Sequence, residues 1–361
     1  MKITKLQTQL VNVPLAKPIR TAIHDMRSVG CILVSLHSDE GLVGEGYCFT
    51  LNAIRLKAFD EVIHSYAPLV EGQDADFIEG IWEQIYQSVN PMGQKGITIG
   101  ALSAIDTALW DLQGKALNKP LHRLFGACRT RIKAYASGGL WLSQTIEELM
   151  AEAQDFLDQG FRSMKVRVGK ASWREDVERV RAVRQVIGDD IELLADANQA
   201  LTPKQAIKLG RELEIFDLGW LEEPVSAQDL QGHADVRWRL DTPIASGETE
   251  YTRYGMRAMI EARACDVLMP DLQRIGGLTE MRKVAALAAS FDMPISTHIF
   301  TEQSLCIAGS APNCISVEHM PWYAPLFKES MELVNGELLI PERAGTGFSF
   351  DPEAIKHYKL L

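Results

Sequence analysis

Eight charged side chains recur along the chain at the ends of short apolar runs. They are Lys165 and Arg167 on one run, then Asp196, Glu222, Glu248, Asp271, His298 and Glu318 on the next six. Taken one per run from Lys165 to Glu318, without Arg167, the successive positions lie 20 to 31 residues apart, about the length of one strand–helix unit. In a barrel of parallel strands the carboxyl ends of the strands meet at one rim, where catalytic groups assemble. The spacing therefore predicts that these side chains surround one site.

Three of these residues, Asp196, Glu222 and Glu248, would supply carboxylates from neighbouring strands. A single Asp at a strand end is most often a helix cap, but capping does not explain the ordered set. Like charges at one point repel unless a cation joins them. Oxygen ligands without Cys or His select a hard cation, Mg²⁺ first and Mn²⁺ second. Glu223 follows directly, and because side chains alternate along a strand, we expect only Glu222 to face inward.

The remaining charged residues suggest how such a site would act. Lys165 and Arg167 share one face of a strand, where we expect them to face an anion held on the metal. Asp271 and His298 come from adjacent strands, so the carboxylate would fix the imidazole tautomer and make His298 a general base near neutral pH. Glu318 is interpreted as a protonated hydrogen-bond donor to a developing oxyanion.

Composition limits the classes of function. The 361-residue chain has a formal charge of −11 and a pI near 5.3, which argues against nucleic acid or an anionic membrane as the main partner. Its six cysteines form no CxxC pair and are expected to be reduced thiols. No apolar run has the length of a membrane span, and the N-terminus lacks the continuous apolar stretch of a signal peptide. We therefore expect a cytoplasmic protein.

The order of predicted elements indicates an α/β protein. Residues 1–128 begin with alternating strand patterns and continue as helices, which indicates a separate α+β domain. Residues 129–325 contain eight short strand-like runs separated by helix-length segments, which predicts a parallel β/α barrel. Residues 326–361 are expected to form an extended segment that returns to the first domain.

Several sequence motifs resemble those of the enolase superfamily, mandelate racemase subgroup, over nearly the whole chain. They are SAIDTALWDLQGK (103–115), KVRVG, ADAN, WLEEP, SGE, MPDLQRIGG and STHIF. The resemblance implies an α/β fold with a (β/α)₇β TIM-like barrel, an N-terminal α+β capping domain and often a homo-octamer. It also implies Mg²⁺ on Asp196, Glu222 and Glu248, a His298–Asp271 dyad, Glu318 beside the substrate carboxylate, and Asn198 as a substrate-binding residue.

One departure from the subgroup concerns proton transfer. Arg167 stands where mandelate racemase-like members have a second Lys as base, and Asp271 stands where the muconate-lactonizing and dipeptide epimerase subgroups have Lys. Guanidinium is not deprotonated in proteins but binds carboxylate or hydroxyl oxygens well. Arg167 therefore argues against racemisation, which needs a base on both faces of the substrate, and favours one-sided abstraction followed by loss of a hydroxyl group.

The segment Lys17–Ser28 resembles the specificity loop of the family. It carries Arg20, His24 and Arg27, which would suit a polyhydroxy mono- or diacid better than an aryl acid, although exposed Arg is also common on solvated surfaces. We read Arg20 and His24 as candidate substrate-binding residues.

These observations favour a Mg²⁺-dependent acid-sugar (aldonate or aldarate) dehydratase. His298 would remove the α-proton through a metal-stabilised enediolate, and loss of the 3-hydroxyl would give a 2-keto-3-deoxy acid. The alternatives are a racemase or epimerase of an α-hydroxy acid with Lys165 as second base, a Schiff-base aldolase that uses Lys165, and a non-catalytic sugar-acid binder.

Overall fold

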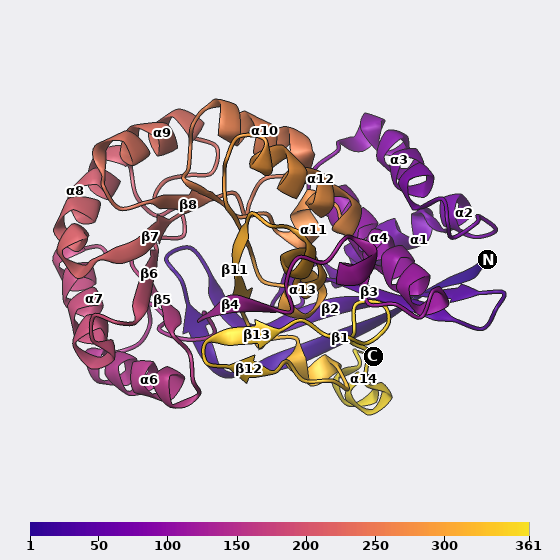
Figure 1. Ribbon diagram of the computed structural model, residues 1–361, viewed down its shortest axis with the longest axis horizontal. Coiled ribbons are helices and arrows are strands. Elements are labelled where there is room, and N and C mark those ends of the chain that lie inside the picture. The colour runs from indigo at the N-terminus through magenta and orange to yellow at the C-terminus, as the bar shows by residue number, and fades with distance from the viewer. Residues whose placement is uncertain (361) are drawn as a thin grey trace.

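Eight parallel strands close into a barrel in the computed structural model, which describes residues 1–360 (Figure 1). The strands are β4 (Arg131–Ala136), β5 (Ser163–Arg167), β6 (Glu192–Asp196), β7 (Leu218–Glu222), β8 (Ile244–Ser246), β9 (Val267–Leu268), β10 (Ile295–Thr297) and β11 (Cys314–His319). They pair in chain order, and β11 returns to pair with β4. The predicted barrel is therefore confirmed.

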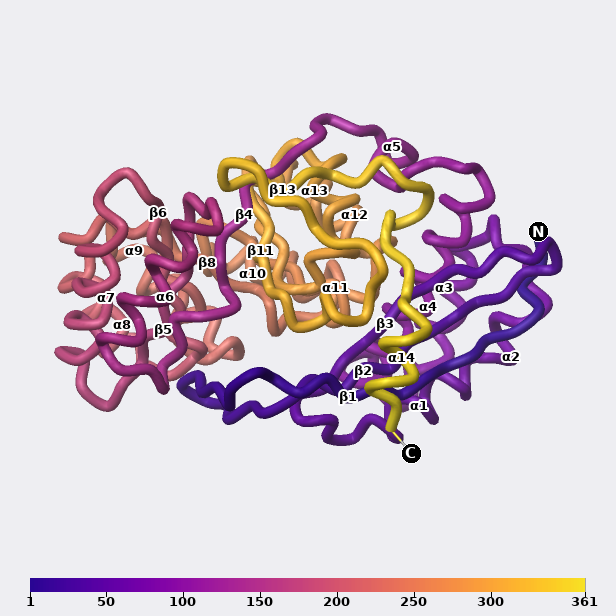
Figure 2. The backbone as a smooth tube through the Cα atoms, turned by 90° about the horizontal axis from the view of Figure 1, so that it is seen from below, coloured from indigo at the N-terminus to yellow at the C-terminus, as the bar shows by residue number. Residues whose placement is uncertain are grey.

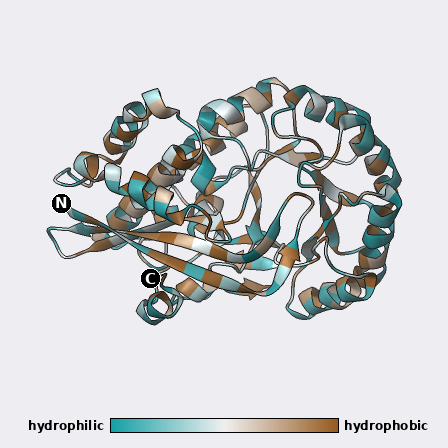
Figure 3. Ribbon diagram, turned by 180° about the vertical axis from the view of Figure 1, so that it is seen from behind, coloured by the Kyte–Doolittle hydropathy of each residue, from teal (hydrophilic) through white to brown (hydrophobic). Residues whose placement is uncertain are grey.

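Helices follow the strands and surround the barrel. They are α6 (Ile146–Asp158), α7 (Trp173–Ile187), α8 (Pro203–Leu213) with η2 (Glu214–Phe216), α9 (Leu230–Arg239), α10 (Thr252–Glu261), α11 (Leu272–Ile275), α12 (Leu278–Ala289) and α13 (Thr301–Ser310). The helix faces that point away from the barrel carry mainly hydrophilic residues (Figure 3). No helix within residues 1–360 is both long and apolar enough to cross a membrane.

Alternation along the barrel strands separates the core from the site. On β5, Met164 and Val166 belong to the large apolar core, whereas Lys165 and Arg167 are buried on the other face. On β7, Trp220 joins a small cluster inside the barrel and Glu222 shares its face two residues later. The expectation that Lys165 and Arg167 share a face is thus met, and that face is the interior of the barrel.

The N-terminal capping domain is a three-stranded antiparallel sheet covered by helices. The strands β1 (Ile3–Arg20), β2 (Asp25–Ser38) and β3 (Val43–Leu51) precede α1 (Leu56–Ser65), α2 (Ala67–Val70), α3 (Ile78–Ser88), η1 (Asn90–Met92), α4 (Ile97–Ala116) and α5 (Leu121–Leu124). Helix α4 packs closely on β3. The close approach leaves no room for a side chain at Gly44 or Gly46, where a Cβ would lie within 2.2 Å of an α4 carbonyl oxygen.

Two contacts bring the capping domain onto the barrel. Thr279 at the start of α12 donates from its backbone N–H and its hydroxyl to the buried Asp106 carboxylate of α4. The tip of the β1–β2 hairpin reaches the mouth of the barrel, where the Leu142 N–H donates to the Arg20 carbonyl. Figure 2 shows this indigo hairpin extending from the capping domain toward the magenta barrel units.

After β11 the chain returns along both domains. It forms η3 (Ala324–Leu326), then the hairpin of β12 (Leu333–Val334) and β13 (Glu337–Leu339), which extends the barrel sheet beside β4, and finally α14 (Pro352–Tyr358). Beyond α14, the Leu360 N–H donates to the Leu10 carbonyl of β1. The C-terminal segment therefore contacts the capping domain, while the predicted boundaries at 128 and 325 stay predictions.

A buried acid lies where the barrel helix α13 meets the capping sheet. Glu302 is fully buried, and neither carboxylate oxygen has a hydrogen-bond partner within residues 1–360. Burial raises the pKa of Glu302 from 4.5 to about 7. Between these two values the unfolded chain ionises while the folded protein keeps the proton, so the free energy of unfolding falls as the pH rises.

We therefore predict that Glu302→Gln removes this pH-dependent loss. At pH 8 the variant should be more stable than the wild type by up to about 3 kcal/mol, the equivalent of the pKa shift, whereas near pH 4.5 the two should differ little. Melting temperatures across this pH range provide the measurement, with the exposed Glu212→Gln of α8 as a control. Equal pH profiles for Glu302→Gln and the wild type would contradict the prediction.

Candidate active site

The eight charged residues meet at the carboxyl-terminal rim of the barrel. Arg167, Asp196 and Glu222 end β5, β6 and β7, and register pairs Arg167 with Asp196 and Asp196 with Glu222. Glu248 follows β8, Asp271 follows β9 and His298 follows β10, while Lys165 lies two residues before the end of β5 and Glu318 one residue before the end of β11. The structure thus brings all eight of the predicted charged residues to one end of the barrel.

These residues surround a small cavity of about 100 Å³ at the junction of the two domains. Its lining comprises Thr21, His24, Met26, Phe49, Leu51, Trp141, Lys165, Arg167, Asp196, Asn198, Glu248, Arg274, His298, Ile299, Glu318, Met320 and Trp322. Glu222 and Asp271 lie behind this lining and hold Lys165 and His298. The capping domain therefore supplies one wall of the cavity and the barrel supplies the rest.

Lys165 stands among three carboxylates. Its ammonium nitrogen lies 2.7 Å from Glu222 Oε1, 2.9 Å from Glu318 Oε1 and 3.5 Å from Asp196 Oδ2. Burial lowers the pKa of Lys165, but the three carboxylates outweigh burial and raise it above its ordinary value. In this arrangement Lys165 is a protonated cation that compensates acidic charge.

The donor set fits a divalent cation. Burial is the largest effect on Glu222, and with the neighbouring carboxylates it raises the pKa to about 8 despite Lys165. A cation placed among these acids would favour their ionised forms. Carboxylate oxygens from Asp196, Glu222 and Glu248 are the ligands that Mg²⁺ prefers.

These three carboxylates are not yet arranged around a common point. Within residues 1–360, no group of three or more His, Cys, Asp or Glu side chains stands together as a metal-ligand cluster. Asp196 and Glu222 turn toward Lys165, and Glu248 Oε2 lies 3.1 Å from His298 Nε2. A shared cation would take over the charge compensation that Lys165 and His298 supply here.

His298 and Asp271 form the predicted dyad. His298 Nδ1 lies 2.7 Å from Asp271 Oδ2, which leaves Nε2 as the nitrogen that faces the cavity. The other Asp271 oxygen accepts the backbone N–H of Arg274 and so begins α11. Burial lowers the pKa of His298, but Glu248 and the other surrounding carboxylates outweigh burial and raise the pKa to about 9.

Glu318 lies where it was predicted, but its protonation differs. It accepts hydrogen bonds from Ser137 Oγ at 2.5 Å and from the Ile299 N–H at 2.8 Å. Burial raises the pKa of Glu318, but Lys165 and His298 outweigh burial and lower it below its ordinary value. The interpretation of Glu318 as a protonated donor is therefore corrected, since here it is an ionised acceptor that orients Lys165.

Arg167 is engaged by the barrel itself. Its Nη1 donates to the Ser137 and Gly139 carbonyls at 3.1 and 3.3 Å, and its Nη2 donates to Ser137 Oγ at 2.9 Å. The guanidinium carbon lies 4.2 Å from the centre of the Trp141 ring. Among its nitrogens, only Nε has no partner within the described chain, 3.6 Å from Asp196 Oδ2. Arg167 therefore keeps Nε–H and one N–H of Nη2 without a partner in the described chain, while its other N–H groups are held by the barrel.

Neighbouring polar residues separate into those that face the cavity and those that do not. Asn198 lines the cavity, and its backbone N–H and side-chain Nδ2 donate to Asp196. Glu223 instead accepts hydrogen bonds from Thr249 and Gln199, whereas Glu222 accepts them from Lys165 and from Trp220 of the interior cluster. The expectation that only Glu222 faces the barrel interior is met.

The hairpin loop contributes less polarity than its sequence suggested. His24 lines the cavity, whereas the Arg20 side chain is 65% exposed, lies 3.4 Å from Asp25 and does not line it. The residues of this loop that lie buried against the cavity are Thr21 and Met26.

Sequence reasoning missed most of the apolar lining and Arg274. Trp141 follows β4 and Trp322 follows β11. Neither tryptophan belongs to the regularly spaced set of charged residues at the strand ends. Arg274 was present in the quoted motif MPDLQRIGG, and its Nη1 donates to the Glu248 carbonyl at 2.6 Å. The signal that could have found these residues is their position in the loops after predicted strands.

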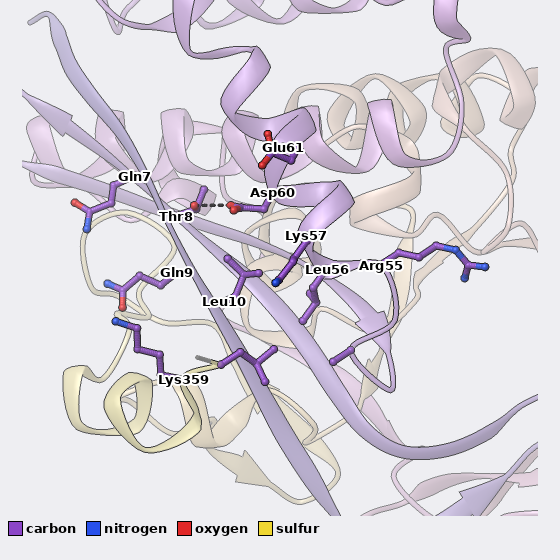
Figure 4. A pocket seen from close by; sticks show the side chains of 12 residues that line it. Gln7, Thr8, Gln9, Leu10, Arg55, Leu56, Lys57, Asp60, Glu61 and Lys359 are labelled. Carbon is purple, nitrogen blue, oxygen red and sulfur yellow. Dashed lines mark hydrogen bonds between the residues drawn. The ribbon is translucent and has the colours of Figure 1, made fainter.

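A larger groove of about 1000 Å³ lies on the outer side of the capping domain (Figure 4). It runs between β1, the start of α1 and Lys359, far in the chain from the strand ends. Its Asp60 accepts a hydrogen bond from Thr8 Oγ1 at 2.5 Å, and Thr8 Oγ1 also contacts His64. Because these polar groups satisfy one another, we assign the chemistry to the smaller cavity.

Two family models match the chain. The model described as the mandelate racemase / muconate lactonizing enzyme N-terminal domain matches residues 3–126. The model described as enolase C-terminal domain-like matches residues 148–354.

Individual relatives match over almost their whole length. The L-talarate/galactarate dehydratase of Salmonella typhimurium is 31% identical over 99% of this chain and 92% of its own. The 3,6-anhydro-alpha-L-galactonate cycloisomerase of Streptomyces coelicolor is 34% identical over 98% of both chains. A solved structure of a variant L-talarate/galactarate dehydratase with Mg and L-glucarate superposes with a TM-score of 0.96 at 31% identity, covering 100% of this chain and 92% of that one.

We predict that Glu222→Gln weakens Mg²⁺ binding at least about tenfold, because even outer partners of metal ligands typically contribute that much. Calorimetric titration of the full chain with MgCl₂ measures the affinity. Glu223→Gln is the matched control, since Glu223 is equally buried but bonded to Thr249 and Gln199. A Glu222→Gln variant that binds Mg²⁺ like the wild type would remove this residue from the ligand set.

Proposed function

Because the chain belongs to the mandelate racemase and muconate lactonizing enzyme family of the enolase superfamily, we propose that it is a Mg²⁺-dependent acid-sugar dehydratase. Its substrate would be an aldonate or aldarate, a polyhydroxy acid with a 2-hydroxy carboxylate. Its product would be the corresponding 2-keto-3-deoxy acid. The relatives support this reaction class, since they include a dehydratase of acid sugars, and a related structure holds Mg.

The metal would be held by Asp196, Glu222 and Glu248. When bound, Mg²⁺ would act as a Lewis acid toward the substrate carboxylate and the negative charge that develops beside it. Lys165 adds a fixed positive charge on the same side, between Asp196 and Glu318. Preorganised charges of this kind act strongly in a site from which water is excluded.

The observation that carries the proposal is a single general base. His298, oriented by Asp271 through Nδ1 at 2.7 Å, presents Nε2 to the cavity. On the opposite side stand Arg167, whose guanidinium does not release a proton, and Lys165, whose ammonium is enclosed by carboxylates. One-sided proton removal does not invert a stereocentre, but it does begin an elimination.

Each step of the elimination balances with the groups present. Burial lowers the pKa of His298, but the surrounding carboxylates outweigh burial and raise it to about 9, so the base at neutral pH is the minor, neutral form of the imidazole. In that form His298 would take the proton from C2, and the electron pair of that C–H bond would move toward the carboxylate. The C3–O bond then breaks, and the departing hydroxyl takes the proton from His298 and leaves as water. The resulting enol gains a proton at C3, releases the proton of its 2-hydroxyl group to solvent and becomes the 2-keto acid.

We predict that His298→Asn lowers turnover at least about 100-fold, in the range typical of a lost general base, while Mg²⁺ affinity stays near that of the wild type. Semicarbazide-reactive keto acid, formed from a panel of acid sugars, reports turnover, and calorimetry reports the metal. The exposed His357→Asn of α14 is the control. Near-normal turnover by His298→Asn would refute the assignment of the base.

The relatives also include an isomerase, so an α-hydroxy-acid racemase or epimerase is the second candidate. Incubation in D₂O separates the two. A dehydratase should give keto acid with deuterium at C3 and no inverted substrate. Deuterium at C2 of the inverted stereoisomer, without keto acid, would favour the isomerase and would require Lys165 to act as a base.

A further inference from the structure

The capping strand β3 has one open edge, and a side chain of the barrel closes that edge at Phe49. Among residues 1–360, β3 pairs only with β2, so its outer edge presents backbone N–H and C=O groups that have no strand partner. Gln273 of α11 accepts the Phe49 N–H through Oε1 at 2.7 Å and donates from Nε2 to the Phe49 carbonyl at 3.3 Å. The Gln273 carboxamide therefore satisfies Phe49 as the peptide group of a neighbouring strand would.

Helix α11 is too short to hold its own position. It has four residues, well below the roughly 12–15 that an isolated helix needs for stability in water. It follows Asp271, whose Oδ1 accepts the Arg274 N–H at 2.8 Å while Oδ2 lies 2.7 Å from His298 Nδ1. The capping domain holds its other end, where Trp82 Nε1 donates to the Gly276 carbonyl at 2.8 Å. The position of this helix, and of the acid that begins it, thus depends on contacts with the capping domain.

The other member of the dyad, His298, is followed by strained backbone. Ile299 and Phe300 have positive φ angles of 29° and 49°, which residues other than glycine rarely adopt, and β-branched residues least of all. Such backbone persists only where the surrounding structure holds it. Phe49 supplies part of that support, because the centre of its ring lies 5.5 Å from that of Phe300 and 5.4 Å from that of Tyr323.

Phe49 of the capping domain therefore contacts the segments that follow both members of the dyad. Its backbone binds the residue two positions after Asp271, and its ring packs on the residue two positions after His298. The barrel itself joins the two strand ends through the His298 N–H, which donates to the Pro270 carbonyl at 3.1 Å. That bond sets the spacing of the two backbones, whereas the rotamers of the two side chains depend on the packing and hydrogen bonds around them.

We propose that Gln273 is a positioning residue for the general base. By closing the edge of β3 at Phe49, it holds Asp271 and His298 in their hydrogen-bonded arrangement. Gln273 is absent from the lining of the cavity, so it acts through these neighbours and not on the substrate. The inference rests on the proposed function only in naming His298 as the base.

Gln273→Met tests the inference, because methionine keeps the length of the side chain and forms neither hydrogen bond with Phe49. An imidazole N–H that is bonded to a carboxylate gives a low-field proton NMR signal, and His298→Asn identifies the signal of His298 by its loss. We expect this signal to weaken or disappear in full-length Gln273→Met, while the Mg²⁺ affinity stays near that of the wild type. An unchanged signal would overturn the inference.

Turnover provides a second readout, with whichever acid sugar of the panel gives keto acid. Gln273→Met should lower kcat at least about tenfold, since a small misplacement of a reacting group can cost about 100-fold, and should leave KM near the wild-type value. Gln273→Glu keeps the length and the acceptor but loses the donor, and should lower kcat and weaken the signal as well. Loosening of the cap alone would instead raise KM, because Phe49 lines the cavity. A raised KM with unchanged kcat would overturn the inference.

Glu79→Met is the matched control. Glu79 of α3 accepts a hydrogen bond from Lys283 of α12 at 2.7 Å, so this variant also removes a contact between the domains but leaves α11 and β3 unchanged. It should alter neither the His298 signal nor kcat. An equal loss in Glu79→Met would overturn the inference, because any contact between the domains would then serve. If the wild type formed keto acid from no acid sugar, the proposed function would fail, and the NMR comparison would still decide the role of Gln273.

Discussion

The organisation of this protein depends on how several buried carboxylates are paired with positive charge. Asp196, Glu222 and Glu318 are almost completely inaccessible to solvent at the end of the barrel. Glu248, which follows β8, is a fourth acid of this group and contacts His298 Nε2. Ionised acids at such depth are costly unless cations pair with them. Lys165 and His298 supply that pairing here, while burial and then the neighbouring carboxylates raise the pKa of Glu222 despite Lys165.

The two domains contribute different kinds of side chain to the cavity. The barrel fixes every charged group at a strand end, where the register of parallel strands sets their separation. The capping domain brings no acid to the cavity; it contributes Thr21, His24, Met26, Phe49 and Leu51. Metal and proton chemistry therefore belong to one domain, whereas the shape and polarity that select a substrate depend on both.

The architecture and the charged ring could be predicted from the sequence because both follow simple periods. Alternation along KVRVG puts Lys165 and Arg167 on one face, and the repeat length of a strand–helix unit brings Asp196, Glu222 and His298 to one rim. Partners set by tertiary contacts could not be found in this way. The sequence gives no sign that Ser137 and Gly139 occupy the guanidinium of Arg167, that Arg20 turns to solvent, or that Lys165 keeps Glu318 ionised.

The position of the metal is the central claim, and a crystal of the full chain grown with Mn²⁺ tests it most directly. Anomalous scattering locates manganese independently of the protein atoms. We expect one strong peak bounded by oxygen atoms of Asp196, Glu222 and Glu248, with Lys165 displaced toward Glu318 and His298 Nε2 freed from Glu248. Manganese bound elsewhere, with Lys165 still enclosed by the three acids of its present site, would show that these carboxylates do not form the metal site.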